Sequence, residues 1–497
     1  RWRDPEGSEV MVMYESGYGS AFEIPGLDQS LAFGHTSDNM GPQSADQVRD
    51  VYREIHALMP DARIFASSLS DFAGHLEKVR HTLPVITSEI GDTWIHGAGS
   101  DPIKVSRFRE LLRLRAEWLA SGKTSYQDRQ FVNFNRWLLM VPEHTWGMDE
   151  KTYLGDLENY SAEKFSAARG FPNFKKFESS WVEKRAYPQL AVNALEDSAL
   201  AEEARARLES IRPARPNLEE WQAISGAALR LETDSMEVEF EENTGSVSHL
   251  LQKTTNRVWV NKPQVFGQLS YQTFSAADYD RFFAAYVIDA QQHDWAREDF
   301  TKPGLTAAEA ESRLWLPRCR AVYGRPRKNA QEILFHLGFD GQVVQRYGAP
   351  GDIYLKYSVC EEVPHMMIDL QWFNKKASRL PEALWFSFQP LVLPDAEWVI
   401  EKMGKEISPL SVVENGNRHL HAAGKYVCCQ AGKAAIKLSP LDSPLVAPGQ
   451  RCLLDFNNEQ PDMREGVHFC LLDNLWGTNF PMWFEEDCLY RYTVDLL

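Results

Sequence analysis

The sequence lacks the features that mark several large classes of protein. It contains no run of about 18 apolar residues, so no membrane-spanning helix is predicted. It also has no block of basic residues, and 53 Lys and Arg against 70 Asp and Glu give a net charge of −17. Nucleic acids and anionic lipid surfaces bind proteins through compensating cations. Neither is therefore expected as a partner of this chain.

Cysteine is scarce and unevenly placed. The 7 cysteines all lie between Cys319 and Cys488, and no CxxC spacing occurs. This pattern indicates neither a zinc knuckle nor a disulfide framework. Such thiols suit a reducing compartment, and we expect a cytoplasmic location. The chain begins at Arg1 and enters the apolar segment Val10–Tyr14 within a few residues, which favours a fragment whose N-terminal portion is missing.

Three regions of different periodicity follow one another. Residues 1–100 alternate short apolar runs with a helix capped by Ser44, a pattern typical of parallel βα units. Only about three units fit there, too few to close a barrel of seven or eight strands, so an incomplete barrel is expected. The runs predicted as buried strands are Val10–Tyr14, Leu31–Phe33, Ile64–Ala66 and Val85–Ile86.

The remainder of the chain changes from helices to strands. Residues 101–212 keep a period of 3.6 and predict a three-helix bundle that ends in a proline-rich linker. Residues 222–497 change to a period of two, clearest at Met236–Phe240, where apolar and acidic residues alternate. This region predicts a large β-sandwich. The predicted fold class is therefore a multidomain α/β plus all-β protein.

Polar residues follow two of the predicted strands. His35 and Asp38 come after the run at Leu31, and a second group follows the run at Val85. The carboxyl ends of strands in βα folds bind ligands, whereas the alternative is local turn and helix capping. The second group contains two carboxylates, an indole and an imidazole, which suit a polar ligand and a sugar ring: Glu89, Asp92, Trp94 and His96.

A third polar segment follows a predicted bundle helix. Pro142 ends that helix, and Glu143, His144 and Trp146 come directly afterwards. A lone histidine is most often a hydrogen-bonded core residue, but this cluster is polar for a core. Both interpretations, a ligand site and a packed core, remain open from the sequence.

These segments resemble the α-mannosidases of glycoside hydrolase family 38 and a related subfamily. In that family a seven-stranded barrel leads into a three-helix bundle and a β-sandwich related to galactose mutarotase. The segments that carry the resemblance are Asp38–Pro42, Trp94–Gly97, Glu143–Gly147, Arg379–Trp385 and Asn474–Phe480. The family's His-x-Asp metal motif and nucleophilic Asp have no match here, and Thr145 stands where the family has Asp after its metal-binding histidine.

The resemblance implies a retaining glycosidase of the α-mannosidase type, with a carbohydrate as substrate. Asp38 would be the catalytic acid/base, and His144 would be one ligand of a zinc ion or other divalent cation. The remaining ligands would lie in the missing N-terminal portion, so this fragment alone is expected to be inactive. The resemblance also implies a sugar pocket lined by His35, Glu89, Asp92, Trp94, His96 and Trp146.

The family resemblance also predicts a distance between His144 and Asp38, and two other functions remain as alternatives. If one metal and one sugar lie between them, His144 and Asp38 should come within roughly 10–15 Å, since metal–ligand bonds are about 2 Å long. The alternatives are a non-catalytic carbohydrate-binding protein and a structural module of a larger assembly. An oligomer is compatible with all three.

Overall fold

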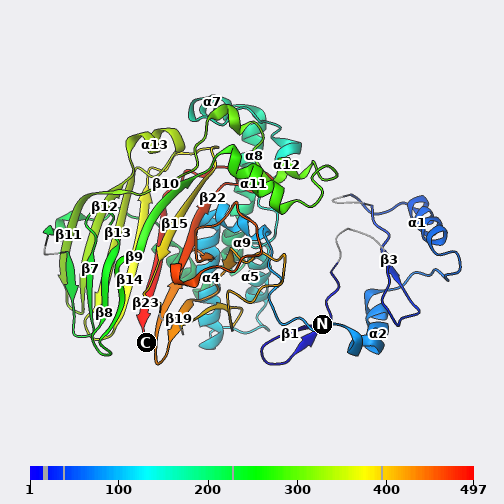
Figure 1. Ribbon diagram of the computed structural model, residues 1–497, viewed down its shortest axis with the longest axis horizontal. Coiled ribbons are helices and arrows are strands. Elements are labelled where there is room, and N and C mark those ends of the chain that lie inside the picture. Colours follow the sequence, from blue (N-terminus) through cyan, green and yellow to red (C-terminus); the bar gives the residue numbers. More distant parts are fainter. Residues whose placement is uncertain (15–20, 37–39, 227–228, 393–395) are drawn as a thin grey trace. The chain divides into compact units, whose positions relative to one another are not determined.

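The structure is a computed structural model that describes residues 1–14, 21–36, 40–226, 229–392 and 396–497 (Figure 1). The chain divides into two compact units, Arg1–Glu89 and Ile90–Leu497. Within the described ranges, no helix combines the length and the apolar character needed to cross a membrane.

The first unit holds short strands and helices. Helix α1 begins with a capping box: Ser44 Oγ accepts a hydrogen bond from Gln47 N, and Gln47 Oε1 accepts one from Ser44 N. The cap predicted at Ser44 is thereby confirmed. The elements are β1 (Trp2–Arg3), β2 (Glu9–Val10), β3 (Ala21–Phe22), β4 (Leu31–Ala32), α1 (Ala45–Leu58), α2 (Leu69–Val79) and the 3-10 helix η1 (Arg80–Thr82).

The apolar runs of this unit form less strand than the sequence predicts. Leu31–Ala32 pairs antiparallel with β3, and Ile64–Ala66 lies outside any strand. Ile86 makes one parallel bridge, to Trp2. Burial of these runs on both faces was the wrong expectation, since Val10 is 54% and Ile86 37% exposed. The N–H and C=O groups of a buried parallel strand need neighbouring strands as hydrogen-bond partners. Here the run at Val85–Ile86 has only one bridge among the described residues, which is too little to form such a strand.

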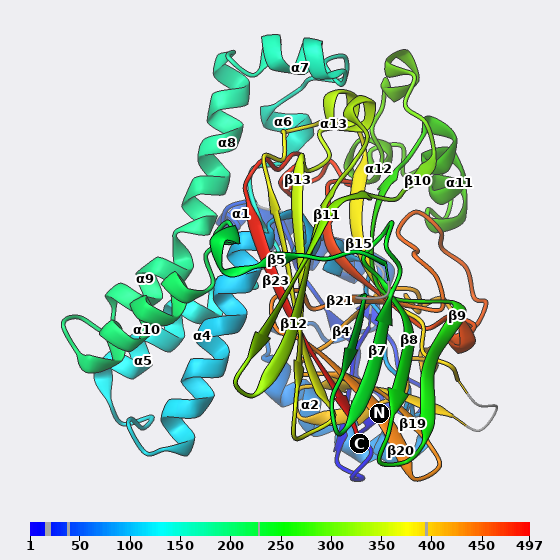
Figure 2. The ribbon, with the colours of Figure 1, turned by 90° about the vertical axis from the view of Figure 1, so that its left-hand side faces the viewer.

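The second unit begins with a helical region that lies to one side of the sheets (Figure 2). Its core contains Trp118 from α4, Phe131 and Phe134 from α5, and Ala204 from α10. The helical elements are η2 (Trp94–His96), α3 (Gly97–Ser100), α4 (Pro102–Ala120), α5 (Arg129–Leu139), α6 (Glu150–Tyr153), α7 (Ala162–Ala168), α8 (Pro172–Arg185), α9 (Tyr187–Asn193) and α10 (Ala199–Ser210).

Buried charges join this helical region to the sandwich. Glu110 on α4 accepts hydrogen bonds from Arg207 on α10 and from Arg491, both at 2.7 Å. Arg113, one turn along α4, also pairs with it. Burial alone would raise the pKa of Glu110, but Arg113, Arg491 and Arg207 lower it to about 2. Removal of this carboxylate would leave three guanidinium groups without their shared partner.

Two large antiparallel sheets follow. Among the described residues, one has 9 strands in the order β18-β21-β22-β15-β9-β8-β7-β6, with β10 on β9, and the other has 10 in the order β17-β16-β19-β20-β23-β14-β13-β12-β11-β5.

The strands of the first sheet are β6 (Arg230–Glu232), β7 (Met236–Phe240), β8 (Val247–Gln252), β9 (Arg257–Thr273), β10 (Arg313–Trp315), β15 (Glu382–Phe388), β18 (His421–Ala422), β21 (Leu445–Pro448) and β22 (Val467–Asp473). Those of the second are β5 (Gln222–Ala223), β11 (Arg318–Arg327), β12 (Ala330–Gly338), β13 (Asp352–Cys360), β14 (His365–Phe373), β16 (Glu397–Lys402), β17 (Lys405–Ile407), β19 (Val427–Ala431), β20 (Ala434–Pro440) and β23 (Cys488–Leu496). Helices α11 (Ala276–Tyr286), α12 (Ala296–Phe300) and α13 (Gly341–Tyr347) and the 3-10 helices η3 (Leu218–Glu220), η5 (Leu305–Ala308) and η6 (Met463–Glu465) lie between strands or before them.

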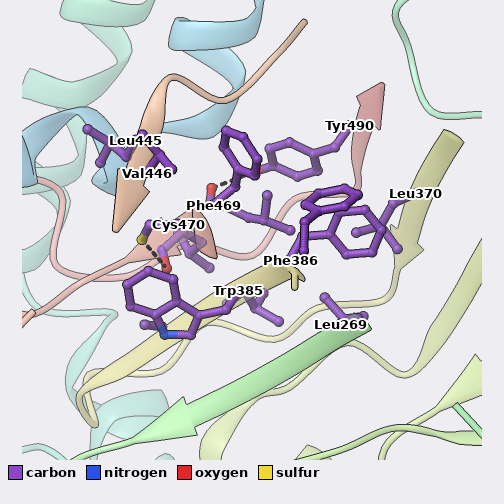
Figure 3. Packing of buried hydrophobic residues seen from close by; sticks show 14 of the residues in the cluster. Leu269, Leu370, Trp385, Phe386, Leu445, Val446, Phe469, Cys470 and Tyr490 are labelled. Atoms are coloured by element: carbon purple, nitrogen blue, oxygen red, sulfur yellow. Dashed lines mark hydrogen bonds between the residues drawn. The ribbon is translucent and has the colours of Figure 1, made fainter. Parts of the chain in front are cut away.

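The core forms where the inner faces of the two sheets meet (Figure 3). Leu370 and Tyr490 come from one sheet, and Trp385, Phe386 and Phe469 from the other. Strands β15 and β22 are buried at every residue, whereas β7 alternates as predicted. Helix α3 contacts β22, which explains why β22 lacks an exposed face. The predicted fold class, helices with a large β-sandwich, is confirmed.

Candidate functional site

Three segments that are far apart in the sequence lie together in the second unit: residues 92–97, 143–147 and 474–480. The indole N–H of Trp94 donates to the carbonyl of His144 over 3.3 Å. Trp146 N donates to Asn479 O over 3.0 Å. The ring of Trp94 packs edge-on against Phe480, with centroids 5.5 Å apart. Three of the five segments that carry the family resemblance thus form one region.

Local hydrogen bonds fix the first segment. Asp92 Oδ1 accepts from Trp94 N over 2.7 Å, and the hydroxyls of Thr93 and Tyr286 are 2.7 Å apart. Asp92 Oδ1 thus closes a local turn directly before the 3-10 helix that contains Trp94.

Two glycines allow this segment to pack closely on the sandwich. A Cβ at Gly97 would lie 2.5 Å from the ring of Phe480, and a Cβ at Gly99 would lie 2.0 Å from Asp473 Oδ2. Both distances are far shorter than a van der Waals contact. The glycines after His96 are thus explained by close packing of α3 on β22 and on the segment that follows β22.

His96 belongs to the packed layer of this region. It is 4% exposed and stacks on Trp476 with ring centroids 4.7 Å apart. Burial lowers the pKa of His96 to about 3, so the ring is neutral at physiological pH. Its Nδ1 atom has no hydrogen-bond partner among the described residues. Through Trp476 this histidine supports the same cluster as Trp94.

Glu143, which is half-buried, and His144, which is exposed, form a carboxylate–imidazole pair in the loop after α5. Glu143 Oε1 lies 2.6 Å from His144 Nδ1. Glu143 Oε2 accepts from Thr145 N and the Thr145 hydroxyl, and Lys184 Nζ lies 3.6 Å away. Burial would raise the pKa of Glu143, but Thr145, His144 and Lys184 together lower it.

The position of Glu143 bears on which nitrogen of His144 is available. An acidic oxygen beside Nδ1 favours the neutral tautomer that carries its proton on Nδ1, and that tautomer leaves the Nε2 lone pair accessible. The His144 side chain is 68% exposed. An oriented imidazole of this kind can take a proton or bind a metal ion, with Glu143 as the orienting carboxylate.

Trp146 has one ring face covered by a lysine. Lys104 Nζ lies 3.2 Å from the centroid of the Trp146 ring, and both residues are buried. Burial lowers the pKa of Lys104 to about 7, against the opposing effect of Asp101. The covered face of Trp146 is closed to a sugar ring, whereas Trp94 is half-buried.

The predicted site residues fall into three groups. Asp38 lies outside the described residues, so its distance from His144 stays a prediction. His35 and Glu89 belong to the first unit, where His35 is exposed and Glu89 half-buried. The second unit brings the other predicted residues together: Asp92, Trp94, His96, His144 and Trp146.

Among the described residues of this region, His144 could supply one ligand to a metal ion. His144 Nε2 is oriented by Glu143 and exposed, as a ligand should be. Across the described ranges, however, no group of three or more His, Cys, Asp and Glu is placed to hold a metal ion. A site with three protein ligands, as catalytic zinc requires, is not assembled from these residues alone.

Sequence reasoning missed the two lysines of this region. Lys104 interrupts the apolar stripe of α4 one residue before Val105, and a cation at a core position is a signal that could have been read. Lys184, from α8, donates to Thr145 Oγ1 over 3.3 Å. Nothing in the sequence near Lys184 indicates that contact, because 39 residues separate the two partners.

The fold defines a class: a helical region followed by a large β-sandwich, as in glycoside hydrolase family 38. Against a protein of that family from Enterococcus faecalis the TM-score is 0.50 at 9% identity, covering 92% of this chain and 63% of that one. Residues 98–367 match the model described as Domain of unknown function (DUF5054). The chain therefore belongs to the DUF5054 family.

Two further comparisons give lower scores. An alpha-mannosidase from Enterococcus faecalis V583 gives a TM-score of 0.49 at 10% identity, over 90% of this chain and 61% of that one. A galactose mutarotase-like protein from Lactobacillus casei gives 0.31 at 8% identity, over 54% of this chain and 99% of that one. The chain spans about three fifths of the length of the two Enterococcus structures. No curated protein matches it.

Proposed function

We propose that this chain is part of a glycoside hydrolase of the α-mannosidase type, which cleaves glycosidic bonds with retention in the presence of a divalent metal ion. The observation that carries the proposal is the pair of Glu143 and the exposed His144, 2.6 Å apart, beside the half-buried Trp94. The likeness of fold to family 38 supports the reaction class and leaves the substrate open.

The residues of the second unit would bind and orient the sugar. Trp94 would offer an apolar surface to the C–H face of a sugar ring. Glu143 would keep the proton on His144 Nδ1, and Thr145 and Lys184 would hold Glu143 in place. Asp92, which is exposed, would accept hydrogen bonds from sugar hydroxyls.

A divalent cation such as zinc would be held by His144 Nε2. Its further ligands would come from parts of the protein outside the described residues. When bound, it would supply positive charge that holds sugar hydroxyls and polarises the reacting ring. Asp38 remains the proposed acid/base. Retaining glycosidases place two carboxyl groups about 5–5.5 Å apart, which is the separation expected between Asp38 and the nucleophile.

The test is hydrolysis of a panel of aryl glycosides by the full-length protein. We expect p-nitrophenyl α-mannoside to be cleaved, a chelator to abolish turnover, and added Zn²⁺ to restore it. The initial product should keep the α configuration, which nuclear magnetic resonance resolves directly.

Three outcomes would overturn the proposal. Turnover that is unchanged by chelation would exclude the metal, and an inverted product would exclude the retaining mechanism. Binding of mannosides without any turnover would favour the alternative, a non-catalytic carbohydrate-binding protein.

A further inference from the structure

A groove of about 480 Å³ opens in the second unit between the start of α4, the end of α10 and the segment that leads into β23. This volume lies in the range of about 300–1,000 Å³ that is common for ligand sites. The groove shares no lining residue with the Glu143–His144 site. Its lining combines arginines, carboxylates and apolar side chains.

One wall carries two arginines. The guanidinium of Arg107, on α4, makes no hydrogen bond or ion pair with any residue that the structure describes. Arg212, beyond the end of α10, pairs only with the exposed Glu209 in that described set, over 3.0 Å. Burial lowers the pKa of Arg107, and the charge of Arg212 lowers it further, against the opposing effect of Glu486 and Asp101. A half-buried cation beside a second cation is a position that an anion would stabilise.

The segment before β23 brings three carboxylates to the groove, and two of them have arginine partners. Glu485 accepts two hydrogen bonds from Arg169, and Glu486 pairs with Arg185. These arginines offset the repulsion that Glu485 and Glu486 would exert on an anion at Arg107, and the third carboxylate, Asp487, accepts a hydrogen bond from Asn374 N. Carboxylate oxygens at the edge of the groove still accept hydrogen bonds from hydroxyl groups.

Apolar side chains also line the groove, with Ile103, Leu208 and Pro213 among them. A pyranose ring has an apolar C–H face and hydroxyls around its rim. Such a ring would place its C–H face on these side chains and its hydroxyls toward Glu486. An anionic substituent on the ring would then face Arg107 and Arg212.

We propose that this groove is a binding site for an anionic sugar, meaning a hydroxylated ring that carries a carboxylate or a phosphate. Arg107 holds the anionic group, with Arg212 as the second cation. The acidic rim holds the hydroxyls. The proposal rests on the groove alone and does not depend on the proposed glycosidase activity.

The test is isothermal titration calorimetry of the 497-residue chain with glucuronate, glucose 6-phosphate, glucose and inorganic phosphate. One or both anionic sugars should bind at least 10-fold more tightly than glucose and than inorganic phosphate. The tighter of the two identifies the substituent, carboxylate or phosphate. Arg107→Gln should lower that affinity at least 10-fold, since a charge-assisted hydrogen bond is lost, whereas Arg205→Gln on the exposed side of α10 should leave it unchanged.

The remaining outcomes decide against the proposal. If neither anionic sugar binds, or if inorganic phosphate binds as tightly as they do, the groove does not recognise anionic sugars. Arg212 is 64% exposed, so Arg212→Gln folds even if Arg107→Gln does not. It should weaken binding at least 3-fold, and unchanged binding in both folded variants would also overturn the proposal.

Discussion

Helix α1 in the first unit and helix α5 in the second are both amphipathic, yet only α5 buries its apolar face. The structure buries Phe131, Phe134 and Leu138 of α5, and it buries no residue of α1. Val48 and Tyr52 of α1 are 40% and 37% exposed. The period of a helix therefore predicts where its apolar face lies, whereas burial of that face depends on what packs against it.

The largest expected effect compares aromatic residues on these two helices. Phe134→Ala should destabilise the second unit by about 4 kcal/mol, because it removes a ring that is 0% exposed and leaves a cavity. Tyr52→Ala on α1 should change stability by less than about 1 kcal/mol. Urea unfolding followed by tryptophan fluorescence measures both. Equal effects would show that α1 packs as tightly as α5.

The next comparison concerns ion pairs. Glu110→Gln should cost about 3 kcal/mol, since Arg113, Arg207 and Arg491 lose a buried partner. Asp46→Asn on α1, whose partner Arg49 is exposed, should cost less than about 0.5 kcal/mol. The same urea experiment applies. A Glu110→Gln variant as stable as the wild type would contradict the buried linkage between helices and sandwich.

The third comparison is between two glycines, Gly99 in the second unit and Gly74 in the first. Gly99→Ala should destabilise by about 2 kcal/mol, because the new Cβ would lie 2.0 Å from Asp473 Oδ2. Gly74→Ala in α2 meets nothing within 4 Å and should stabilise by about 0.5–1 kcal/mol through helix propensity. Thermal unfolding of both variants measures the pair. A neutral Gly99→Ala would mean that α3 is not fixed on β22.

The last comparison concerns the dependence of stability on pH. The pKa of Lys104 is about 7 in the folded chain, below its ordinary value, because of burial. The unfolded chain therefore binds more protons between about pH 7 and 10, and the contribution of Lys104 to stability rises with pH across this window. Lys104→Met removes this slope and should stabilise by about 3 kcal/mol more at pH 7 than at pH 10.

The control for that measurement is Lys78→Met on α2, which removes an exposed lysine. Urea midpoints at the two pH values give the comparison. A Lys104→Met variant with the same pH dependence as the wild type would contradict burial of a lysine over Trp146.

The sequence predicts local features of the fold well and its long-range contacts poorly. The alternation at Met236–Phe240 predicts β7, and Ser44 predicts the start of α1, because each signal depends on neighbouring residues. In α4 the buried face includes Leu111, Leu114 and Trp118, whereas the adjacent apolar residue Leu112 is 38% exposed. Which side of a long helix is buried depends on its tertiary partners.

The long-range contacts of the candidate site could not be predicted from the sequence either. Asp92 and Trp94 are recognisable as polar and aromatic residues in a short segment, but their roles depend on other segments. The contact from Trp94 to His144 spans 50 residues, and the stack of His96 on Trp476 joins the helical region to the sandwich. No local pattern encodes such pairs. The orientation of His144 by Glu143, in contrast, joins adjacent residues.

The measurement that tests the account most directly is kcat/KM of the full-length protein for p-nitrophenyl α-mannoside in three variants. His144→Ala should lower it at least about 1,000-fold and reduce bound zinc, and Glu143→Gln should lower it about 10–100-fold through loss of the orienting carboxylate. His293→Ala, an exposed histidine elsewhere in the second unit, should leave it unchanged. A His144→Ala variant with wild-type activity and wild-type zinc content would contradict the account.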